Sequence, residues 1–268
     1  MFSVDAESIK IWQKFNYYNF VESSHQYYYY DKPVSFSVTQ YISRFFPEFD
    51  KENISKKYAL KHNMTQEEVL ADWQRKGDIS AISGTIVHAY LENAKRGKTF
   101  DIDYSPAVKA GIELEVKDRV NILLPKAQAF HKDTLGKLYP VQLEYTVGIQ
   151  DVIAGNIDML CWNDYAKEFQ IWDYKNTKEM AQTNYFDNTC LGPFSGYPDC
   201  SYIHYSIQLN TYKAILQREL GVSIGDMYLV HFNYTKPDDE FDIYKCKDFQ
   251  SIVNKELDKL VEEHNANK

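Results

Sequence analysis

The stretch VQLEYTVGIQDVIAGNIDMLCWNDYAKEFQIWDYK, residues 141–175, decides the fold of this chain. It contains three runs rich in β-branched and aromatic residues, namely residues 141–149, 152–162 and 168–174. The runs are short and are separated by turn residues, a pattern typical of strands rather than helices. We therefore expect three consecutive antiparallel strands at the centre of the molecule.

Helical periodicity and capping residues dominate the sequence on both sides of these strands. On the N-terminal side we expect a short hairpin at 25–37 and helices over residues 5–20, 38–46, 50–61, 65–77, 81–95 and 106–124. On the C-terminal side we expect a long loop at 177–201, helices over 205–220 and 249–263, and strands over 227–234 and 241–246. The predicted fold class is α/β, with an N-terminal helical extension over residues 1–79 and a core over residues 80–268.

The length of 268 residues allows one large domain or two small ones, and 30 Lys+Arg against 38 Asp+Glu give a net charge of −8. Nucleic-acid binding by so acidic a chain needs a local basic patch and should weaken steeply with salt. No apolar run approaches the roughly 18 residues of a membrane helix, and the first residues lack the pattern of an export signal. We expect no membrane partner and a cytoplasmic location. The four cysteines form no C-x-x-C pair, which favours free thiols over a zinc or iron–sulfur site.

Two acidic residues and a lysine lie close together in the predicted strands. Asp173 and Lys175 are two residues apart, so they share one face of their strand. Asp158, on the preceding strand, could meet Asp173 across the hairpin, and two such carboxylates suit a hard divalent cation. A D-x-K triplet in a strand is also compatible with an ordinary salt bridge at a sheet edge. These three residues alone leave both interpretations open.

Further polar residues share single helical faces. Gly84, His88 and Glu92 are spaced by four residues, as are Gln208 and Tyr212, so each set lies along one stripe of its helix. Each pattern by itself is more typical of ordinary structural residues. Their order along the chain is far more specific.

The succession of these motifs resembles the RecB-like branch of the PD-(D/E)XK nuclease superfamily, including its phage-encoded members. The resemblance covers residues 79–219 and implies a restriction-endonuclease-like core with a mixed central sheet flanked by helices. The residues that match, in chain order, are Gly84 and His88, Glu144, Gly155-Asn156-Ile157-Asp158, Asp173-Tyr174-Lys175, and Gln208 with Tyr212. The proline of the family name is absent, because Ile157 precedes Asp158.

The resemblance also implies a metal centre holding Mg²⁺ or Mn²⁺. Asp158, Asp173 and the carbonyl oxygen of Tyr174 would bind the ion, and His88 would contribute to it or to a second ion. Glu144 would assist this site directly or through water. The iron–sulfur relatives carry a cysteine quartet that this chain lacks, since no cysteine precedes Cys161, so we expect no cluster.

The remaining matched residues would serve catalysis. Lys175 would position the attacking water, and Gln208 and Tyr212 would orient the lysine and the substrate backbone. Lys175 could act as a general base only in its neutral form. The chain has no phosphate-binding motif of a helicase.

Basic and aromatic residues offer surfaces for DNA. Lys95 and Arg96 follow the predicted His88 helix, and further lysines lie in the N-terminal helices, namely Lys51, Lys56, Lys57 and Lys61. These charges are equally compatible with a solvated helix face. Four aromatic residues of the long loop could stack on unpaired bases, or they could instead fix the loop to the sheet: Tyr185, Phe186, Phe194 and Tyr197.

The function predicted from the sequence is therefore a Mg²⁺-dependent DNA exonuclease acting on free or single-stranded ends. It would serve replication, repair or recombination, with proteins of those processes as partners, in the host cytoplasm if the chain is phage-encoded. The alternatives are a flap- or branch-cutting endonuclease, a non-catalytic subunit that binds DNA ends, and a structural protein stabilised by metal.

Overall fold

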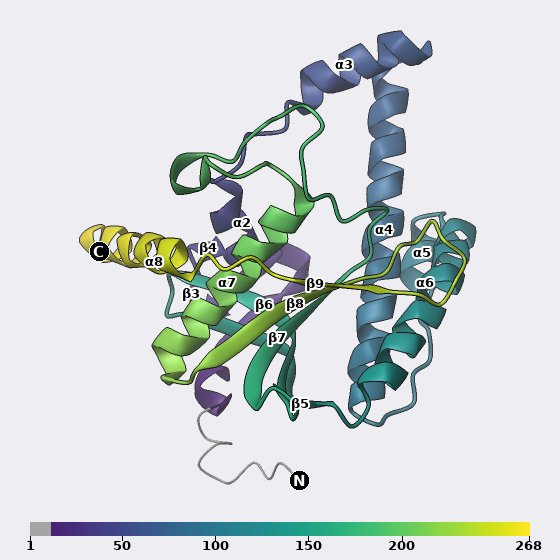
Figure 1. The fold of residues 1–268 in the computed structure, drawn as a ribbon. Coiled ribbons are helices and arrows are strands. Elements are labelled where there is room, and N and C mark those ends of the chain that lie inside the picture. The colour runs from purple at the N-terminus through teal and green to yellow at the C-terminus, as the bar shows by residue number, and fades with distance from the viewer. Residues whose placement is uncertain (1–11) are drawn as a thin grey trace.

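A mixed β-sheet lies between two helical layers in the computed structural model, which describes residues 12–268 (Figure 1). The α-helices are α2 (Val38–Ser43), α3 (Lys51–His62), α4 (Gln66–Lys95), α5 (Ser105–Lys109), α6 (Glu113–Thr134), α7 (Ser201–Leu220) and α8 (Gln250–Ala266). Short 3-10 helices are η1 (Gln13–Phe15), η2 (Glu22–Ser24) and η3 (Gly192–Phe194). The strands are β1 (Tyr18–Val21), β2 (Gln26–Tyr29), β3 (Lys32–Pro33), β4 (Phe36–Ser37), β5 (Leu138–Ile149), β6 (Ile153–Asn163), β7 (Glu168–Lys175), β8 (Ile224–His231) and β9 (Asp242–Lys245).

The central sheet has the strand order β4-β6-β7-β8-β9, and β5 pairs with β6. Strands β5, β6 and β7 are consecutive and antiparallel, which confirms the prediction from residues 141–175. Strand β8 runs parallel to β7, and the connection between them contains α7. The sheet is therefore mixed, and the α/β fold class predicted from the sequence is confirmed.

Each face of the sheet packs against its own set of helices. Ile171 and Leu229 belong to a core cluster that includes residues of α2, α7 and α8. Trp172 and Val230, their neighbours along the strands, belong to a second cluster with residues of α4 and α6. This alternation follows from the two-residue period of a strand. The sheet is consequently buried on both faces, with α4 and α7 on opposite sides of it (Figure 1).

Helix α4 differs from the sequence prediction, which ended one helix at Gly77 and began another at residue 81. The structure has a single helix of 30 residues, capped at its start by a capping box between Thr65 and Glu68. A glycine inside a helix costs only about 1 kcal/mol relative to alanine, too little to break a helix that packs along its length. The predicted boundary between residues 79 and 80 therefore falls within α4.

The helix predicted over residues 5–20 does not continue through residues 13–20. Residues 5–11 lie outside the described part of the chain, and residues 13–15 and 18–21 form η1 and β1. Strand β1 pairs with β2, which pairs with β3, so the expected hairpin at 25–37 is part of a small three-stranded sheet. Its aromatic residues favour strand pairing over a lone helix. Strand β4 joins the central sheet through a parallel pairing with β6.

The helix predicted over residues 106–124 is two helices in the structure. Helix α5 ends near Gly111, whose φ of +68° suits a residue without a side chain. Helix α6 then continues to Thr134, through Pro125. Its buried face packs on α4 and on the sheet.

Candidate functional site

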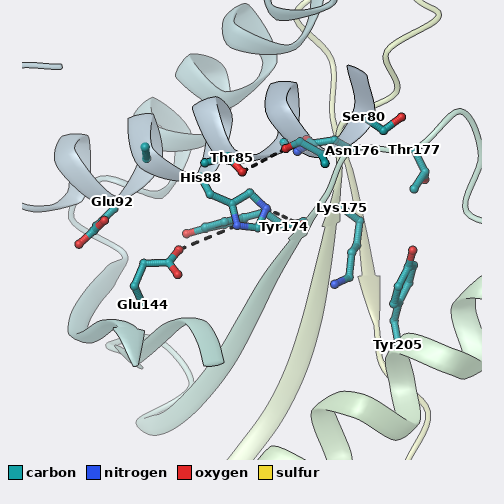
Figure 2. Close-up of a pocket in the computed structure, with 13 residues that line it drawn as sticks. Ser80, Thr85, His88, Glu92, Glu144, Tyr174, Lys175, Asn176, Thr177 and Tyr205 are labelled. Atoms are coloured by element: carbon teal, nitrogen blue, oxygen red, sulfur yellow. Dashed lines mark hydrogen bonds and ion pairs between the residues drawn. The ribbon is translucent and has the colours of Figure 1, made fainter. Parts of the chain in front are cut away.

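A cavity of about 570 Å³ lies between α4, β5, the C-terminal end of β7 and α7 (Figure 2). Helix α4 contributes Gly84, His88 and Glu92 to its lining, at the four-residue spacing seen in the sequence. Glu144 and Lys175 contribute from the strands. The cavity therefore gathers motifs that lie more than 80 residues apart in the chain.

The backbone at Glu144 explains why carboxylates meet at this point. Leu143 and Met159 pair across β5 and β6 and pack toward α4 and α6, whereas Tyr145 and Ile157 pair and pack toward α7. In each strand, residues two apart therefore point to opposite sides of the sheet instead of the same side. This reversal occurs at Glu144 in β5 and at Asp158 in β6. Glu144 has a φ of +48°, a left-handed conformation that costs a glutamate roughly 1–3 kcal/mol. Strain of this kind is concentrated at functional sites.

Three side chains form a group with the donors of a metal site. His88 Nδ1 lies 3.6 Å from Asp158 Oδ1 and 3.9 Å from Glu144 Oε1. One ligand atom from each of the three lies within 4.8 Å of the others, and among the described residues this is the group with that property. Asn156 donates a 2.5 Å hydrogen bond to the second oxygen of Glu144 and holds that carboxylate in place.

The backbone of Tyr174 completes this side of the site. Its N–H donates to Asp158 Oδ2 at 2.7 Å, which fixes the Asp158 carboxylate. Its carbonyl oxygen lies 3.1 Å from His88 Nε2 (Figure 2). The oxygen predicted to be a metal ligand therefore contacts one ring nitrogen of His88, and the carboxylates of Glu144 and Asp158 face the other.

Asp173 and Lys175 lie on the α7 side of the same strand end. Lys175 Nζ is 2.6 Å from Asp173 Oδ2, and the side chains are 16% and 5% exposed. The ammonium also lies 4.4 Å from the ring centre of Tyr205 on α7. The structure thus pairs Asp173 with the lysine and leaves it outside the group formed by His88, Glu144 and Asp158.

Burial and like charge raise the pKa of two carboxyl groups here. Burial, reinforced by the Asp158 charge, raises the pKa of Glu144 from 4.5 to about 7. Burial raises the pKa of Asp173 from 3.8 to about 6, against the lowering effect of Lys175 and with a further increase from Asp158. Burial alone would lower the pKa of Lys175, but the carboxylates of Asp173 and Asp158 outweigh it and raise that pKa. The lysine is therefore a cation at neutral pH, and the carboxyl cluster has an excess of negative charge when it ionises.

The remaining matched residues support the site from α7. Gln208 donates a 3.1 Å hydrogen bond to the hydroxyl oxygen of Tyr212. The ring of Tyr212 packs against Gly155, where an added Cβ would lie 2.8 Å from ring atom Cε1. Because Gly155 of the G-x-x-D motif has no side chain, it leaves room for the ring of Tyr212 of the Q-x-x-x-Y motif. The two motifs are structurally complementary.

The predicted DNA-binding lysine and arginine have other contacts. Lys95 donates to Thr134 on α6 at 2.6 Å and lies over the ring of Phe130, which places it in the interface between α4 and α6. Arg96 is exposed and pairs with Glu92 at 2.8 Å, near the rim of the cavity. Of the two charges, that of Arg96 is the one at the surface, where a phosphate could compete with Glu92 for it.

The loop aromatics divide into two pairs. Tyr185 and Phe186 are 93% and 78% exposed, so stacking on bases remains a prediction for them. Phe194 is buried against Phe45, and Tyr197 packs on Phe249, so these two fix the loop to the hydrophobic core rather than presenting free rings.

Three residues near the site were not singled out by the sequence. Asn156 was quoted only as part of a motif, yet it orients Glu144. Tyr205, three residues before Gln208, covers Lys175. Burial, and after it the charge of Glu144, raises the pKa of Tyr27 in the small sheet to about 12. Tyr205 shares a helical face with Gln208, a signal the sequence contained, whereas no local signal connects Tyr27 with the site.

Comparisons with known proteins identify no family for this chain. No family model matches the sequence, and no curated protein matches it. One solved structure, described as the crystal structure of SSO0001, is similar at 13% identity and a TM-score of 0.28, over 72% of this chain and 85% of that one. Within the described residues, no helix combines the length and apolar character needed to cross a membrane.

Proposed function

We propose that this chain is a metal-dependent deoxyribonuclease with a RecB-like PD-(D/E)XK core that hydrolyses phosphodiester bonds from the ends of unpaired DNA. One observation carries the proposal. The donor group of His88, Glu144 and Asp158 lies on one side of a strand end whose other side carries the ion pair between Lys175 and Asp173. A divalent cation next to a half-buried lysine can stabilise the negative charge that develops in phosphodiester hydrolysis and activate the attacking water.

The donor set fits Mg²⁺ or Mn²⁺. Two carboxylates and a backbone carbonyl supply the oxygen ligands that these hard ions prefer, and one imidazole is compatible with Mn²⁺. Burial raises the pKa of Glu144 and repulsion by Asp158 raises it further, and a cation between the carboxylates would relieve that repulsion. When bound, such an ion supplies positive charge to a phosphate oxygen and lowers the pKa of a water molecule.

The chain's own residues assign the rest of the chemistry. Lys175 keeps its proton, so it donates hydrogen bonds to the attacking water or to a phosphate oxygen and stabilises the negative charge that develops there. Asp173 holds the ammonium in place and Tyr205 covers it. A protonated lysine is not the general base of the reaction. Tyr212, hydrogen-bonded to Gln208, packs against β6 at Gly155, three residues before Asp158.

The test compares degradation of end-labelled linear and covalently closed circular single-stranded DNA in Mg²⁺. Wild type is assayed beside Lys175→Ala and beside Lys167→Ala, a control lysine that forms only an exposed ion pair in the β6–β7 turn. We expect wild type and the control to degrade linear DNA alone, and Lys175→Ala to be inactive.

Each other outcome has a definite meaning. Cleavage of circular DNA would show that the enzyme is an endonuclease rather than an exonuclease. Equal activity of Lys175→Ala and wild type would remove the proposed site. Absence of turnover by wild type in both Mg²⁺ and Mn²⁺, with retained binding to DNA ends, would indicate a non-catalytic end-binding subunit.

A further inference from the structure

Helices α3 and α4 meet in an elbow that presents aromatic rings outside the hydrophobic core. Phe49 is 61% exposed and Tyr58 is 39% exposed, and their rings lie 6.0 and 6.1 Å from that of Trp73. None of the three rings belongs to a core cluster among the described residues. In Figure 1, α3 lies across the N-terminal end of α4, beyond the sheet. The elbow therefore holds a group of half-exposed rings that the packing of the core does not use.

One face of α4 joins these rings to the candidate site. Trp73, Gly77, Ser80, Gly84 and His88 are spaced by three or four residues and so lie along one face of the helix. The last three line the cavity. A Cβ added at Gly77 would meet nothing within 4 Å, so the face is open between Trp73 and Ser80. At 1.5 Å per residue, the distance from Trp73 to His88 along the helix is about 22 Å.

The elbow also carries positive charge. Lys57 and Lys61 are exposed and one helical turn apart on α3, on either side of Tyr58. In the described part of the chain neither forms an ion pair, whereas Lys56 pairs with Glu52 and Lys76 with Asp72. On a chain with a net charge of −8, two unpaired lysines beside exposed rings form the local basic patch that phosphate binding requires.

We propose that the α3–α4 elbow is a binding surface for an unpaired DNA strand on its way to the cavity, an inference that rests on the proposed function. Trp73, Tyr58 and Phe49 stack on bases, and Lys57 and Lys61 contact phosphates. Stacking rings combined with cations are the means by which proteins hold single strands without reading their sequence. A strand stacked at 3.4 Å per nucleotide spans the 22 Å to His88 in about six nucleotides.

The test measures binding in EDTA, where cleavage does not interfere, by fluorescence anisotropy of a labelled 15-nucleotide oligothymidylate and of a 15-base-pair duplex. The variants are Trp73→Ala, Gly77→Leu and the control Tyr165→Ala, which removes a 78% exposed ring in the β6–β7 turn. Trp73→Ala should weaken binding of the single strand about five- to 150-fold, whereas Tyr165→Ala should bind it as wild type does. Gly77→Leu should weaken it as well, because its side chain occupies the open face without impairing the helix.

A salt titration supplies an independent readout. The double variant Lys57→Ala with Lys61→Ala should reduce the slope of log K against log salt by about 1.4, since each phosphate contact on a single strand contributes about 0.7. Urea unfolding of every variant shows whether it is folded, and Gly77→Leu remains informative if Trp73→Ala is not.

The results separate this surface from the nuclease proposal. If Trp73→Ala and Gly77→Leu both bind the single strand within twofold of wild type, the elbow is not a binding surface, even if wild type degrades DNA. An equal loss with Tyr165→Ala, or equal weakening of duplex binding, would overturn it too. If the two variants bind the single strand more weakly and wild type degrades no DNA, the elbow is supported as a binding surface and the proposed nuclease activity is refuted.

Discussion

Replacing Gly155 with alanine should disturb both the stability of this protein and the position of Tyr212. The added Cβ would lie 2.8 Å from Tyr212 Cε1, 3.1 Å from its hydroxyl oxygen and 3.0 Å from Val38 Cγ2. Both neighbours are enclosed in the core, since Tyr212 is 2% exposed and Val38 is fully buried. Overpacking a core by one methyl group costs about 1–3 kcal/mol, and contacts on two sides favour about 2 kcal/mol here.

The assay is urea unfolding of four proteins: wild type, Gly155→Ala, Tyr212→Leu and the double variant. The alanine should cost about 2 kcal/mol in the wild-type background and at least about 1 kcal/mol less once the ring is removed, which a double-mutant cycle measures as coupling. Gly77→Ala is the matched control. Its Cβ meets nothing within 4 Å, so it should stabilise the protein by roughly 0.5–1 kcal/mol through helix propensity.

Two results would refute this reasoning. A Gly155→Ala protein within about 0.5 kcal/mol of wild type would mean that the ring does not fill the space at the glycine. An equal cost in both backgrounds would mean that the strain lies elsewhere than against Tyr212.

Three further predictions concern charge. The pKa of Glu144 is raised to about 7, so the contribution of this carboxyl group to stability is complete below about pH 4.5 and is lost as pH rises through 7. Between pH 5 and pH 8 in EDTA, the free energy of unfolding of Glu144→Gln should therefore rise by on the order of 2–3 kcal/mol relative to that of wild type. A difference between the two proteins that does not change with pH in urea unfolding would contradict this. Mg²⁺ at pH 8 should raise the melting temperature of wild type but not of His88→Ala or Asp158→Asn, as followed by differential scanning fluorimetry; equal shifts would show that binding occurs elsewhere. Burial lowers the pKa of Lys95 to about 8, so the unfolded state binds more protons than the folded state between pH 8 and 10.5. The free energy of unfolding should therefore rise with pH over that interval. The same rise in a Lys95→Met protein would show that Lys95 does not cause it.

The sequence predicted the strands and most helices because their signals are local. A strand alternates every two residues and a helix every 3.6, so residues 141–175 show their three strands without reference to the rest of the chain. The failures are also informative. Gly77 resembled a helix end, but its small local cost is outweighed by the packing of α4, which no window of sequence contains.

The candidate site was predictable as a set of residue types and only partly as an arrangement. The motif order named His88, Glu144, Asp158, Asp173 and Lys175, and the structure brings all five to one strand end. The sequence left open whether Asp173 pairs with Lys175 or binds a metal ion, and it could not place Glu144 beside the imidazole. That division depends on which face of the sheet each side chain occupies.

The sequence by itself determined the fold class, the three central strands and the residue types available for chemistry. Only the tertiary structure decided that β5 and β6 exchange faces at Glu144, that Tyr212 fills the space at Gly155, and that Lys95 lies between two helices. The physical reason is the range of the forces involved. Backbone preference and hydrophobic period act between neighbours in the chain, whereas burial, charge pairing and close packing act between residues that become neighbours only after folding.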